Sequence, residues 1–263
     1  MQTKTIWITG ASSGIGKELA LQYAALNCSL ILSSRRQAEL EEVASVCESL
    51  GARCLVLPFD LTAIVDAESL VEKALTLTGK IDVLINNGGI SQRGLAIDTK
   101  LEVLRKIMEV NFFGQVQLSQ ALLREFIKAR GGHFAVVSSL TGKFGWGLRS
   151  AYSASKHALH GYFESLAIEN FKYKVKITMI CPVSITTNIS LNALNADGTM
   201  KGSMDESHLK GLSASACATQ IIEAIKQNKR EVLIGKKERF MVQIKRFLPS
   251  VFFKKAIKLD PWL

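Results

Sequence analysis

The sequence predicts an α/β fold: a single doubly wound parallel sheet of seven strands with helices on both faces. Two observations support this prediction. Apolar runs of strand length alternate with longer stretches in which apolar residues recur every three or four positions, the spacing of an amphipathic helix. The strand-length runs also lack the polar/apolar alternation of a half-exposed sheet, which is expected where helices cover both faces of a parallel sheet.

The predicted elements follow one another as repeated strand–helix units. The strands are Thr5–Thr9, Ser29–Ser33, Arg53–Pro58, Val83–Asn86, His133–Ser138, Lys176–Cys181 and Glu231–Ile234. The helices are Glu18–Ala25, Ala38–Leu50, Asp66–Leu77, Leu101–Lys128, Ser153–Phe171 and Ala214–Gln227. Such a series is typical of a Rossmann-like sheet, in which ligands bind at the carboxyl ends of the strands.

We expect one catalytic domain over residues 1–235 and a basic extension of the same domain over residues 236–263. The chain has 263 residues, of which 48% are hydrophobic, so one domain can bury a large core without disulfides or a structural metal. Residues 187–210 are rich in Asn, Ser, Gly and Asp and lack strong periodicity. A stretch of that length inside a domain is usually a lid or binding loop, and we predict that role for it.

Composition argues against several classes of protein. No run of about 20 uncharged apolar residues occurs, and no signal peptide precedes the first strand, so we expect a cytoplasmic protein without a membrane span. The five cysteines show no CxxC spacing, which argues against a disulfide framework or a zinc site. We therefore expect buried core thiols and no bound metal.

The net charge of +10 is concentrated near the C-terminus, where residues 226–258 hold eleven Lys and Arg against two Glu. The rest of the chain is close to neutral, which argues against a nucleic-acid binder. Within residues 236–248, Phe240, Ile244 and Phe247 recur at helical spacing among basic residues, and a second apolar-basic run follows over residues 251–259. Such a segment can contact an anionic membrane surface, or its apolar face can pack on this subunit or a partner subunit.

A glycine-rich turn follows the first predicted strand and opens the first helix. Glycines there let the backbone approach a pyrophosphate, whose charge then lies among the unpaired N–H groups of the helix N-terminus. The alternative is an ordinary strand-to-helix connection. The residues predicted to bind phosphate are Gly10, Ser12, Ser13, Gly14, Ile15 and Gly16.

The end of the second predicted strand indicates which cofactor binds. A carboxylate there would accept hydrogen bonds from the adenosine ribose of NAD, but this chain has Ser34, Arg35 and Arg36. Two guanidiniums and no acid suit the 2′-phosphate of NADP(H). We expect Arg35 to be the main contact, whereas Arg36 can instead cover the first turn of the next helix. Further cofactor contacts are predicted after the third and fourth strands, at Asp60, Leu61, Asn87, Gly88 and Gly89.

Tyr152 and Lys156 are four positions apart in a predicted helix and so share one face. Alone, such a pair is usually exposed, but Ser139 at the end of the preceding strand favours a catalytic interpretation. A neighbouring ammonium favours tyrosinate, so the tyrosine can exchange a proton with a carbonyl or alcohol, while Ser139 bonds the substrate oxygen. Asn111, in a mostly apolar helix, is either a satisfied core amide or a support for Lys156 through water.

Together these motifs resemble the classical short-chain dehydrogenase/reductase family, in its hydroxysteroid-dehydrogenase-like branch, from about residue 4 to residue 235. The resemblance implies that Tyr152 exchanges the substrate proton, that Lys156 binds the nicotinamide ribose and lowers the tyrosine's pKa, and that Ser139 orients the substrate. It also implies that Asn111 anchors a water and that the nicotinamide end is held by Pro182, Ile185 and Thr187.

Two residues depart from the family pattern. Gly88 occupies a position where the family usually has Ala, a small change that should be tolerated. Val183 occupies a position where the family usually has Gly after the proline. A β-branched residue resists the positive φ that glycine permits, so the path of residues 182–187 is expected to differ from the family's.

The sequence thus predicts an NADP(H)-dependent oxidoreductase that transfers a hydride between nicotinamide and a carbonyl or secondary alcohol. We expect a lipophilic substrate that enters over residues 140–149, because Phe144, Trp146 and Leu148 would make the pocket apolar. The alternative is a catalytically idle NADP(H)-binding regulatory or scaffold protein, against which the complete Ser/Tyr/Lys set counts. The family resemblance also implies a homo-oligomer, either a dimer or a tetramer.

Overall fold

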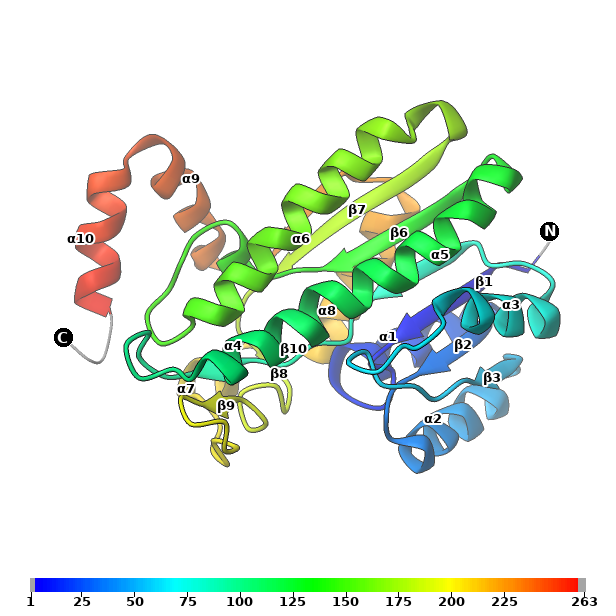
Figure 1. Ribbon diagram of the computed structural model, residues 1–263, viewed down its shortest axis with the longest axis horizontal. Coiled ribbons are helices and arrows are strands. Elements are labelled where there is room, and N and C mark those ends of the chain that lie inside the picture. Colours follow the sequence, from blue (N-terminus) through cyan, green and yellow to red (C-terminus); the bar gives the residue numbers. More distant parts are fainter. Residues whose placement is uncertain (1–2, 260–263) are drawn as a thin grey trace.

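The computed structural model describes residues 3–259, in which one seven-stranded parallel sheet carries helices on both faces (Figure 1). Its spatial order is β11-β7-β6-β4-β1-β2-β3, which confirms the predicted doubly wound, Rossmann-like fold. The order reverses between β1 and β4, and ligands of such sheets bind outside the carboxyl ends of the strands at that point. The strands are β1 (Thr5–Thr9), β2 (Ser29–Ser33), β3 (Cys54–Val56), β4 (Val83–Asn86), β6 (Gly132–Val137), β7 (Val175–Pro182) and β11 (Glu231–Ile234).

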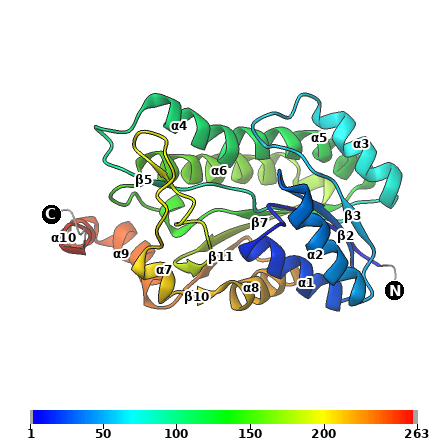
Figure 2. The same ribbon diagram turned by 90° about the horizontal axis from the view of Figure 1, so that it is seen from below.

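Two layers of helices enclose the sheet (Figure 2). One face is covered by α1 (Gly14–Ala25), α2 (Gln37–Ser49) and α8 (Ala214–Lys226). The other is covered by α3 (Ala67–Thr78), α5 (Gly114–Ala129) and α6 (Ser150–Glu169). Short 3-10 turns occupy Leu140–Gly142, Phe171–Tyr173 and Lys237–Arg239.

Burial on both faces explains why the strands lack polar/apolar alternation. In β1, Ile6 and Ile8 pack into the core beneath α1, whereas Trp7 between them packs into the core beneath α5, and all three are fully buried. Each strand of the centre of the sheet therefore requires apolar residues at consecutive positions.

The predicted helix 101–128 is instead three consecutive elements. These are α4 (Leu101–Met108), a π-helical turn η1 (Glu109–Phe113) and α5. Gly114 begins α5 directly against the third βα connection, because a Cβ there would lie 2.2 Å from the carbonyl oxygen of Leu61. The π turn, which contains Asn111, changes the rotation of the helix between its two halves, and no apolar periodicity reveals such an insertion.

Three other predicted elements had ends that were wrong by one to four residues. Helix α1 starts at Gly14 and not at Glu18, and α6 spans Ser150–Glu169 and not 153–171. Strand β3 is shorter than the apolar run that predicted it. Apolar periodicity misses the first turn of α1 because that turn consists partly of glycine, which contributes no apolar side chain to the pattern.

The predicted lid, residues 187–210, contains more regular structure than its composition indicated. It includes β9 (Leu194–Asn195), which pairs with β5 (Gln92–Arg93), and α7 (Glu206–Leu209). On either side of it, β8 (Ile185–Thr186) pairs with β10 (Leu212–Ser213). Two-residue strands are too short to show a period of two. The lid function itself stays a prediction.

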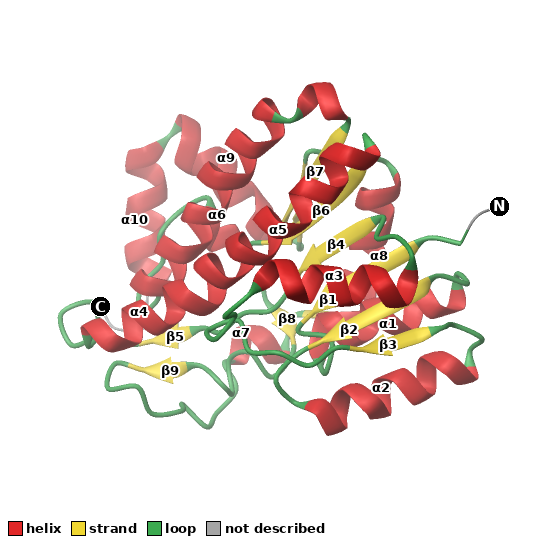
Figure 3. Cartoon of the chain, turned by 45° about the vertical axis from the view of Figure 1, so that its right-hand side comes forward, coloured by secondary structure: helices red, strands yellow, loops and turns green. Residues whose placement is uncertain are grey.

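The C-terminal extension forms two helices, α9 (Phe240–Phe247) and α10 (Pro249–Leu259), at one end of the molecule (Figures 1 and 3). They attach to the domain through the buried Phe252, whose ring lies 5.1 Å from that of Phe144, centre to centre. Residues 1–2 and 260–263 of the predicted domain limits lie outside the described residues. Among the helices that are described, none is both long enough and apolar enough to cross a membrane.

Candidate active site

A cavity of about 900 Å³ opens at the carboxyl ends of the strands, where the sheet order reverses. Every predicted cofactor residue except Gly16 lines it. Of the predicted catalytic residues, Ser139, Tyr152 and Lys156 line the cavity, whereas Asn111 does not. The fold therefore gathers residues from almost the whole length of the chain around one space.

The glycine-rich turn is packed too closely for side chains at two of its positions. Gly10 has a φ of +65°, and a Cβ there would lie 2.9 Å from the Cα of Gly88. A Cβ on Gly16 would lie 2.2 Å from the carbonyl oxygen of Gly10, so Gly16 contributes by close packing and not by lining the cavity. Ser13, the N-cap of α1, makes no side-chain capping bond, which leaves the first N–H groups of the helix for an anion. This geometry fits a diphosphate.

The two arginines after β2 both line the cavity. Arg36 donates hydrogen bonds from Nη2 to the hydroxyls of Ser12 and Ser13, at 2.9 and 3.0 Å, and its Nη1 lies 3.4 Å from Glu39 of α2. The Nη1 atom of Arg35 lies 3.7 Å from Oδ2 of Asp60. Arg36 thus covers the first turn of α2, which was the alternative role predicted for it, and it also contacts the glycine-rich turn.

Hydrogen bonds fix the loop after β4 to the loop after β1. The hydroxyl oxygen of Thr9 accepts from the N–H groups of Asn87 and Gly88, both at 3.0 Å, and Asn87 Nδ2 donates to the carbonyl of Thr9 at 3.0 Å. The Asp60 carboxylate is held in turn by the N–H and hydroxyl of Thr62, both at 2.8 Å from Oδ1. These walls of the cavity are therefore preorganised.

Tyr152, Lys156 and Ser139 meet at the other end of the cavity. The Lys156 ammonium lies 5.8 Å from the centre of the Tyr152 ring and donates to the carbonyl of Val137 at 2.8 Å. Burial raises the pKa of Tyr152, although a hydrogen bond with Ser139 acts to lower it. Burial also lowers the pKa of Lys156 to about 8. At neutral pH the Tyr152 phenol therefore keeps its proton, and the charged form of Lys156 is only moderately favoured over the neutral amine.

The Ser139 hydroxyl has a defined orientation. Its oxygen accepts from the N–H of Thr141 at 3.2 Å and from the Thr141 hydroxyl at 3.0 Å. Its own proton has a long contact of 3.5 Å with the carbonyl of Pro182. A substrate oxygen at this position would compete easily for that proton.

Asn111 is a satisfied amide behind the cavity wall. Its Oδ1 accepts from the N–H of Ile90 at 2.8 Å, and its Nδ2 donates to the carbonyl of Ile90 at 2.9 Å and to the hydroxyl of Ser155 at 3.0 Å. Ser155, which the sequence analysis missed, is fully buried one residue before Lys156 and connects η1 to α6. A water held for Lys156 stays a prediction.

Val183 does not need the positive φ that glycine permits, and a difference from the family's path over residues 182–187 stays a prediction. The positive φ, +33°, belongs to Ser184 and not to Val183. Val183 continues the sheet pattern, with its N–H donating to Ile234 at 2.9 Å, and a Cβ on Gly235 would lie 2.2 Å from its Cγ1. The space for the β-branched side chain is therefore provided by a glycine on the neighbouring strand connection.

The expected apolar wall is only partly present. Phe144 and Trp146 line the cavity, but Leu148 does not, because its backbone turns at a φ of +59° and its carbonyl accepts from Gly94 at 3.0 Å. Charged residues missed by the sequence analysis, Arg93 and Arg149, line the cavity instead. They share the carboxylate of Asp205, which lies 112 and 56 positions away, and no local spacing could have indicated that contact.

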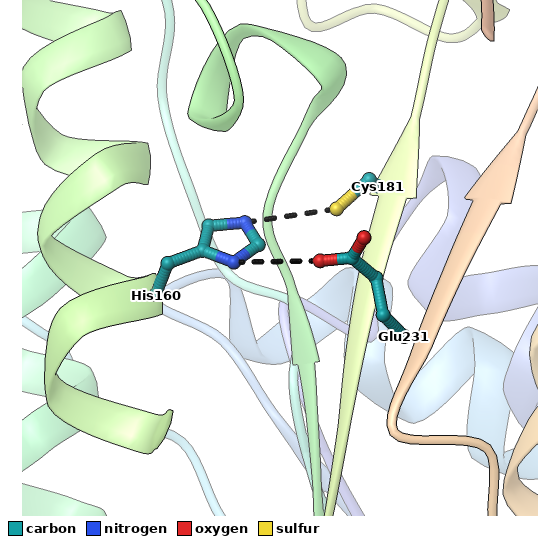
Figure 4. A group of neighbouring side chains, drawn as sticks. All are labelled: His160, Cys181 and Glu231. Atoms are coloured by element: carbon teal, nitrogen blue, oxygen red, sulfur yellow. Dashed lines mark hydrogen bonds and ion pairs between the residues drawn. The ribbon is translucent and has the colours of Figure 1, made fainter. Parts of the chain in front are cut away.

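The expectation of buried thiols holds for four cysteines, whereas Cys54 is only partly buried. Within residues 3–259, His160, Cys181 and Glu231 lie close enough to one another to suggest a shared metal ion (Figure 4). However, the two ring nitrogens of His160 face different partners: Nε2 lies 3.6 Å from the thiol and Nδ1 lies 3.8 Å from the carboxylate. Burial raises the pKa of Cys181 to about 12, so the thiol stays protonated. The group is better described as a polar network joining α6, β7 and β11.

Comparison with known proteins agrees with this geometry. The family model described as short chain dehydrogenase matches residues 4–197. The chain is 36% identical over 260 residues to dehydrogenase/reductase SDR family member 7B of Xenopus tropicalis, covering 96% of this chain and 84% of that protein. It is 39% identical over 267 residues to dehydrogenase/reductase SDR family protein 7-like of Anopheles gambiae, covering 98% and 84%. The expected hydroxysteroid-dehydrogenase-like branch is compatible with these relatives.

Solved structures share the fold. A short chain dehydrogenase/reductase from Burkholderia phymatum in complex with NAD superposes with a TM-score of 0.83 at 22% identity, covering 95% of both chains. An alcohol dehydrogenase from Thermococcus sibiricus complexed with 5-hydroxy-NADP gives 0.78 at 22% identity, covering 90% of this chain and 97% of that one. With the family match over residues 4–197, these findings show that the chain belongs to the short-chain dehydrogenase/reductase family.

Proposed function

We propose that this protein is an NADP(H)-dependent oxidoreductase that interconverts a carbonyl and a secondary alcohol. The main support for the proposal is that a cofactor site and a catalytic group line the same cavity. At one end lies the glycine-rich turn with two guanidiniums, and at the other lies a buried tyrosine beside a serine and a lysine.

The preference for NADP(H) rests on charge. Arg35 and Arg36 line the cavity, and Arg36 lies within hydrogen-bond distance of Ser12 and Ser13 in the glycine-rich turn. A 2′-phosphate between these side chains would accept charge-assisted hydrogen bonds from the planar guanidiniums. Asp60, the carboxylate that lines the cavity beside these arginines, pairs with Arg35 at 3.7 Å and accepts from Thr62, so it favours a bound cation over a ribose hydroxyl.

When bound, NADP(H) supplies or takes the hydride. Tyr152 donates its proton to the carbonyl oxygen during reduction, because burial keeps the phenol protonated. Ser139 holds that oxygen with the proton that Thr141 leaves unused. Lys156 stabilises the tyrosinate that remains, since an ammonium nearby favours the charged form of the phenol.

The alternative function is an idle NADP(H)-binding protein, and turnover separates the two. NADPH oxidation is measured with a panel of ketones and aldehydes, and NADP⁺ reduction with the matching alcohols. The Tyr152→Phe variant should lose about 10²- to 10⁴-fold in kcat while it binds NADPH as the unchanged protein does. Tight NADPH binding with no turnover of any substrate would support the idle protein instead.

We also propose that the C-terminal extension contacts an anionic membrane surface, such as the cytoplasmic leaflet. Its apolar residues divide into two sets. Phe252, Met241 and Ile244 pack toward Phe144, so the extension belongs to the same domain. A second set remains exposed among the basic residues of the same helices, and consists of Phe240, Phe247, Leu248, Val251, Phe253, Ile257 and Leu259. Exposed apolar and basic side chains together match the boundary of an anionic bilayer.

Flotation tests this contact. The protein should rise with phosphatidylserine vesicles at low salt and release at high salt, and the double variant Phe247→Ser, Phe253→Ser should stay at the bottom. Both residues are exposed, so the fold should be unaffected. The alternative is that a second copy of the chain covers this surface. In that case the unchanged protein stays at the bottom and elutes as an oligomer in gel filtration, whereas the double variant elutes as a monomer.

A further inference from the structure

One cluster of charged side chains beside the substrate end of the cavity holds more cations than carboxylates. Arg93 in β5, Arg149 before α6 and Lys201 in the predicted lid all contact the carboxylate of Asp205. Three cations share one carboxylate, so within residues 3–259 this cluster has a formal excess of two positive charges.

The two arginines of this cluster line the cavity, but its carboxylate does not. Arg93 and Arg149 line the cavity, whereas Asp205 and Lys201 lie outside its lining. The side chains of Arg93 and Arg149 are only 8% and 22% exposed. Both act to lower the pKa of Tyr152 against the larger opposite effect of burial, so both lie near the reacting position.

The two arginines differ in the hydrogen bonds that they already make. Arg93 donates through Nε and Nη2 to Asp205, and through Nη1 to the hydroxyl of Ser91 and the carbonyl of Gln92. Arg149 makes a single side-chain hydrogen bond to the described residues, from Nη2 to Asp205 at 3.3 Å. Most of its N–H groups are therefore left for another partner.

A buried cation with unused donors is unfavourable unless something neutralises it. The environment of Arg149 disfavours its charge: burial and the neighbouring Arg93 lower the pKa of its guanidinium to about 10. Fixing Asp205 and the lid does not require Arg149, since Arg93 and Lys201 already bind that carboxylate with shorter contacts. A purely structural latch thus accounts for Arg93 but not for Arg149.

We infer that Arg149 binds an anionic group of the substrate, a carboxylate or a phosphate, while Arg93 and Asp205 hold it in position. The inference rests on the proposed function, because it places that group on the molecule whose carbonyl or hydroxyl reaches Tyr152. The planar guanidinium matches the two oxygens of such a group. Phe144, Trp146 and Met241 line the same cavity, so the remainder of the substrate is apolar. The substrate class is therefore an amphiphilic oxo acid or oxo phosphate, or the corresponding hydroxy compound.

Ligand binding tests the inference without requiring turnover. Octanoate, octyl phosphate and octan-1-ol are titrated by thermal shift, each with and without NADPH. The anions should bind about 10- to 100-fold more tightly than the alcohol, the range of a charge-assisted hydrogen-bonded pair. The more tightly bound anion identifies the headgroup. In Arg149→Met, the affinities for the two anions should fall to the affinity for octan-1-ol.

Lys201→Met is the matched control. The substitution removes a positive charge that pairs with Asp205, as Arg149 does, but Lys201 lies outside the cavity lining. The preference for anions should therefore persist. The melting temperature without ligand shows whether each variant folds. If Arg149→Met does not fold, Arg149→Gln replaces it, because the amide can still donate to Asp205.

Turnover extends the test to the substrate itself. Oxo acids of increasing chain length, each beside its methyl ester, should show the acid favoured in kcat/KM, and Arg149→Met should remove that preference. Two results would overturn the inference: equal binding of octan-1-ol and the anions, or an anion preference that survives in Arg149→Met. Failure of the proposed function has a different signature, namely anion binding that depends on Arg149 in a protein that binds no nucleotide.

Discussion

The ammonium of Lys156 lies 5.8 Å from the centre of the Tyr152 ring, and both side chains are buried at the end of one cavity. Burial acts on the two groups in opposite directions, raising the pKa of the phenol and lowering that of the ammonium to about 8. Proton loss from the tyrosine and charge on the lysine are therefore linked. A charged Lys156 stabilises the tyrosinate in addition to Arg149 and Arg93, and this contribution is lost when the lysine becomes neutral.

This linkage predicts the pH dependence of reduction. Lys156 is charged below about pH 8 and neutral above it, so kcat/KM for carbonyl reduction should fall as pH rises through about 8. Lys156→Arg keeps its charge throughout, and its lower activity should not show that decline. Steady-state kinetics from pH 6 to 10, at saturating NADPH, measure both profiles. An identical decline in the two proteins would contradict the linkage.

Substitution of two glycines separates close packing from general helix stability. Gly16→Ala places a Cβ 2.2 Å from the carbonyl oxygen of Gly10, so we expect a loss of about 1–3 kcal/mol in unfolding free energy and much weaker NADPH binding. Gly161→Ala, exposed in α6 with no atom within 4 Å of the new Cβ, should instead gain about 0.5–1 kcal/mol. Urea denaturation and nucleotide titration measure these effects. Equal behaviour of the two variants would show that the turn can relax.

The buried His133 should make the folded protein less stable in acid. Burial, with Lys176 and Lys4, lowers its pKa to about 4, so the folded chain binds this proton less readily than the unfolded chain, in which the pKa is about 6.5. Stability is fully present above pH 6.5 and declines as pH falls toward 4, by about 2 kcal/mol at pH 5 for this group. His133→Gln should show a smaller decline between pH 7 and 5 in urea denaturation. Other buried histidines affect both proteins equally, so the difference isolates His133.

Features with a local cause could be predicted from the sequence. The strands, the sheet type, the glycine-rich turn and the Tyr152–Lys156 pair each depend on residues a few positions apart. The π turn at Asn111 could not be predicted, because it depends on how α5 packs against Leu61. Nor could the space for Val183, which is supplied by Gly235 some fifty positions later.

The charge of the substrate end was missed for the same reason. The apolar residues of 140–149 predicted an apolar pocket, yet Arg149 of that segment lines the pocket and has most of its hydrogen-bond donors unused among the described residues. Its partner Asp205 belongs to the predicted lid, and Arg93 to a two-residue strand. Contacts between such distant segments follow from the folded topology and leave no periodic signal.

Nucleotide titration shows directly whether the protein depends on NADP(H). NADPH and NADH are titrated by fluorescence into the unchanged protein and into Arg35→Asp, with Lys17→Asp, which removes a positive charge from α1 outside the cavity lining, as the control. NADPH should bind more tightly than NADH by at least about tenfold, Arg35→Asp should remove this preference, and the control should retain it. Equal affinity for the two nucleotides in the unchanged protein, or no binding of either, would contradict an NADP(H)-dependent enzyme.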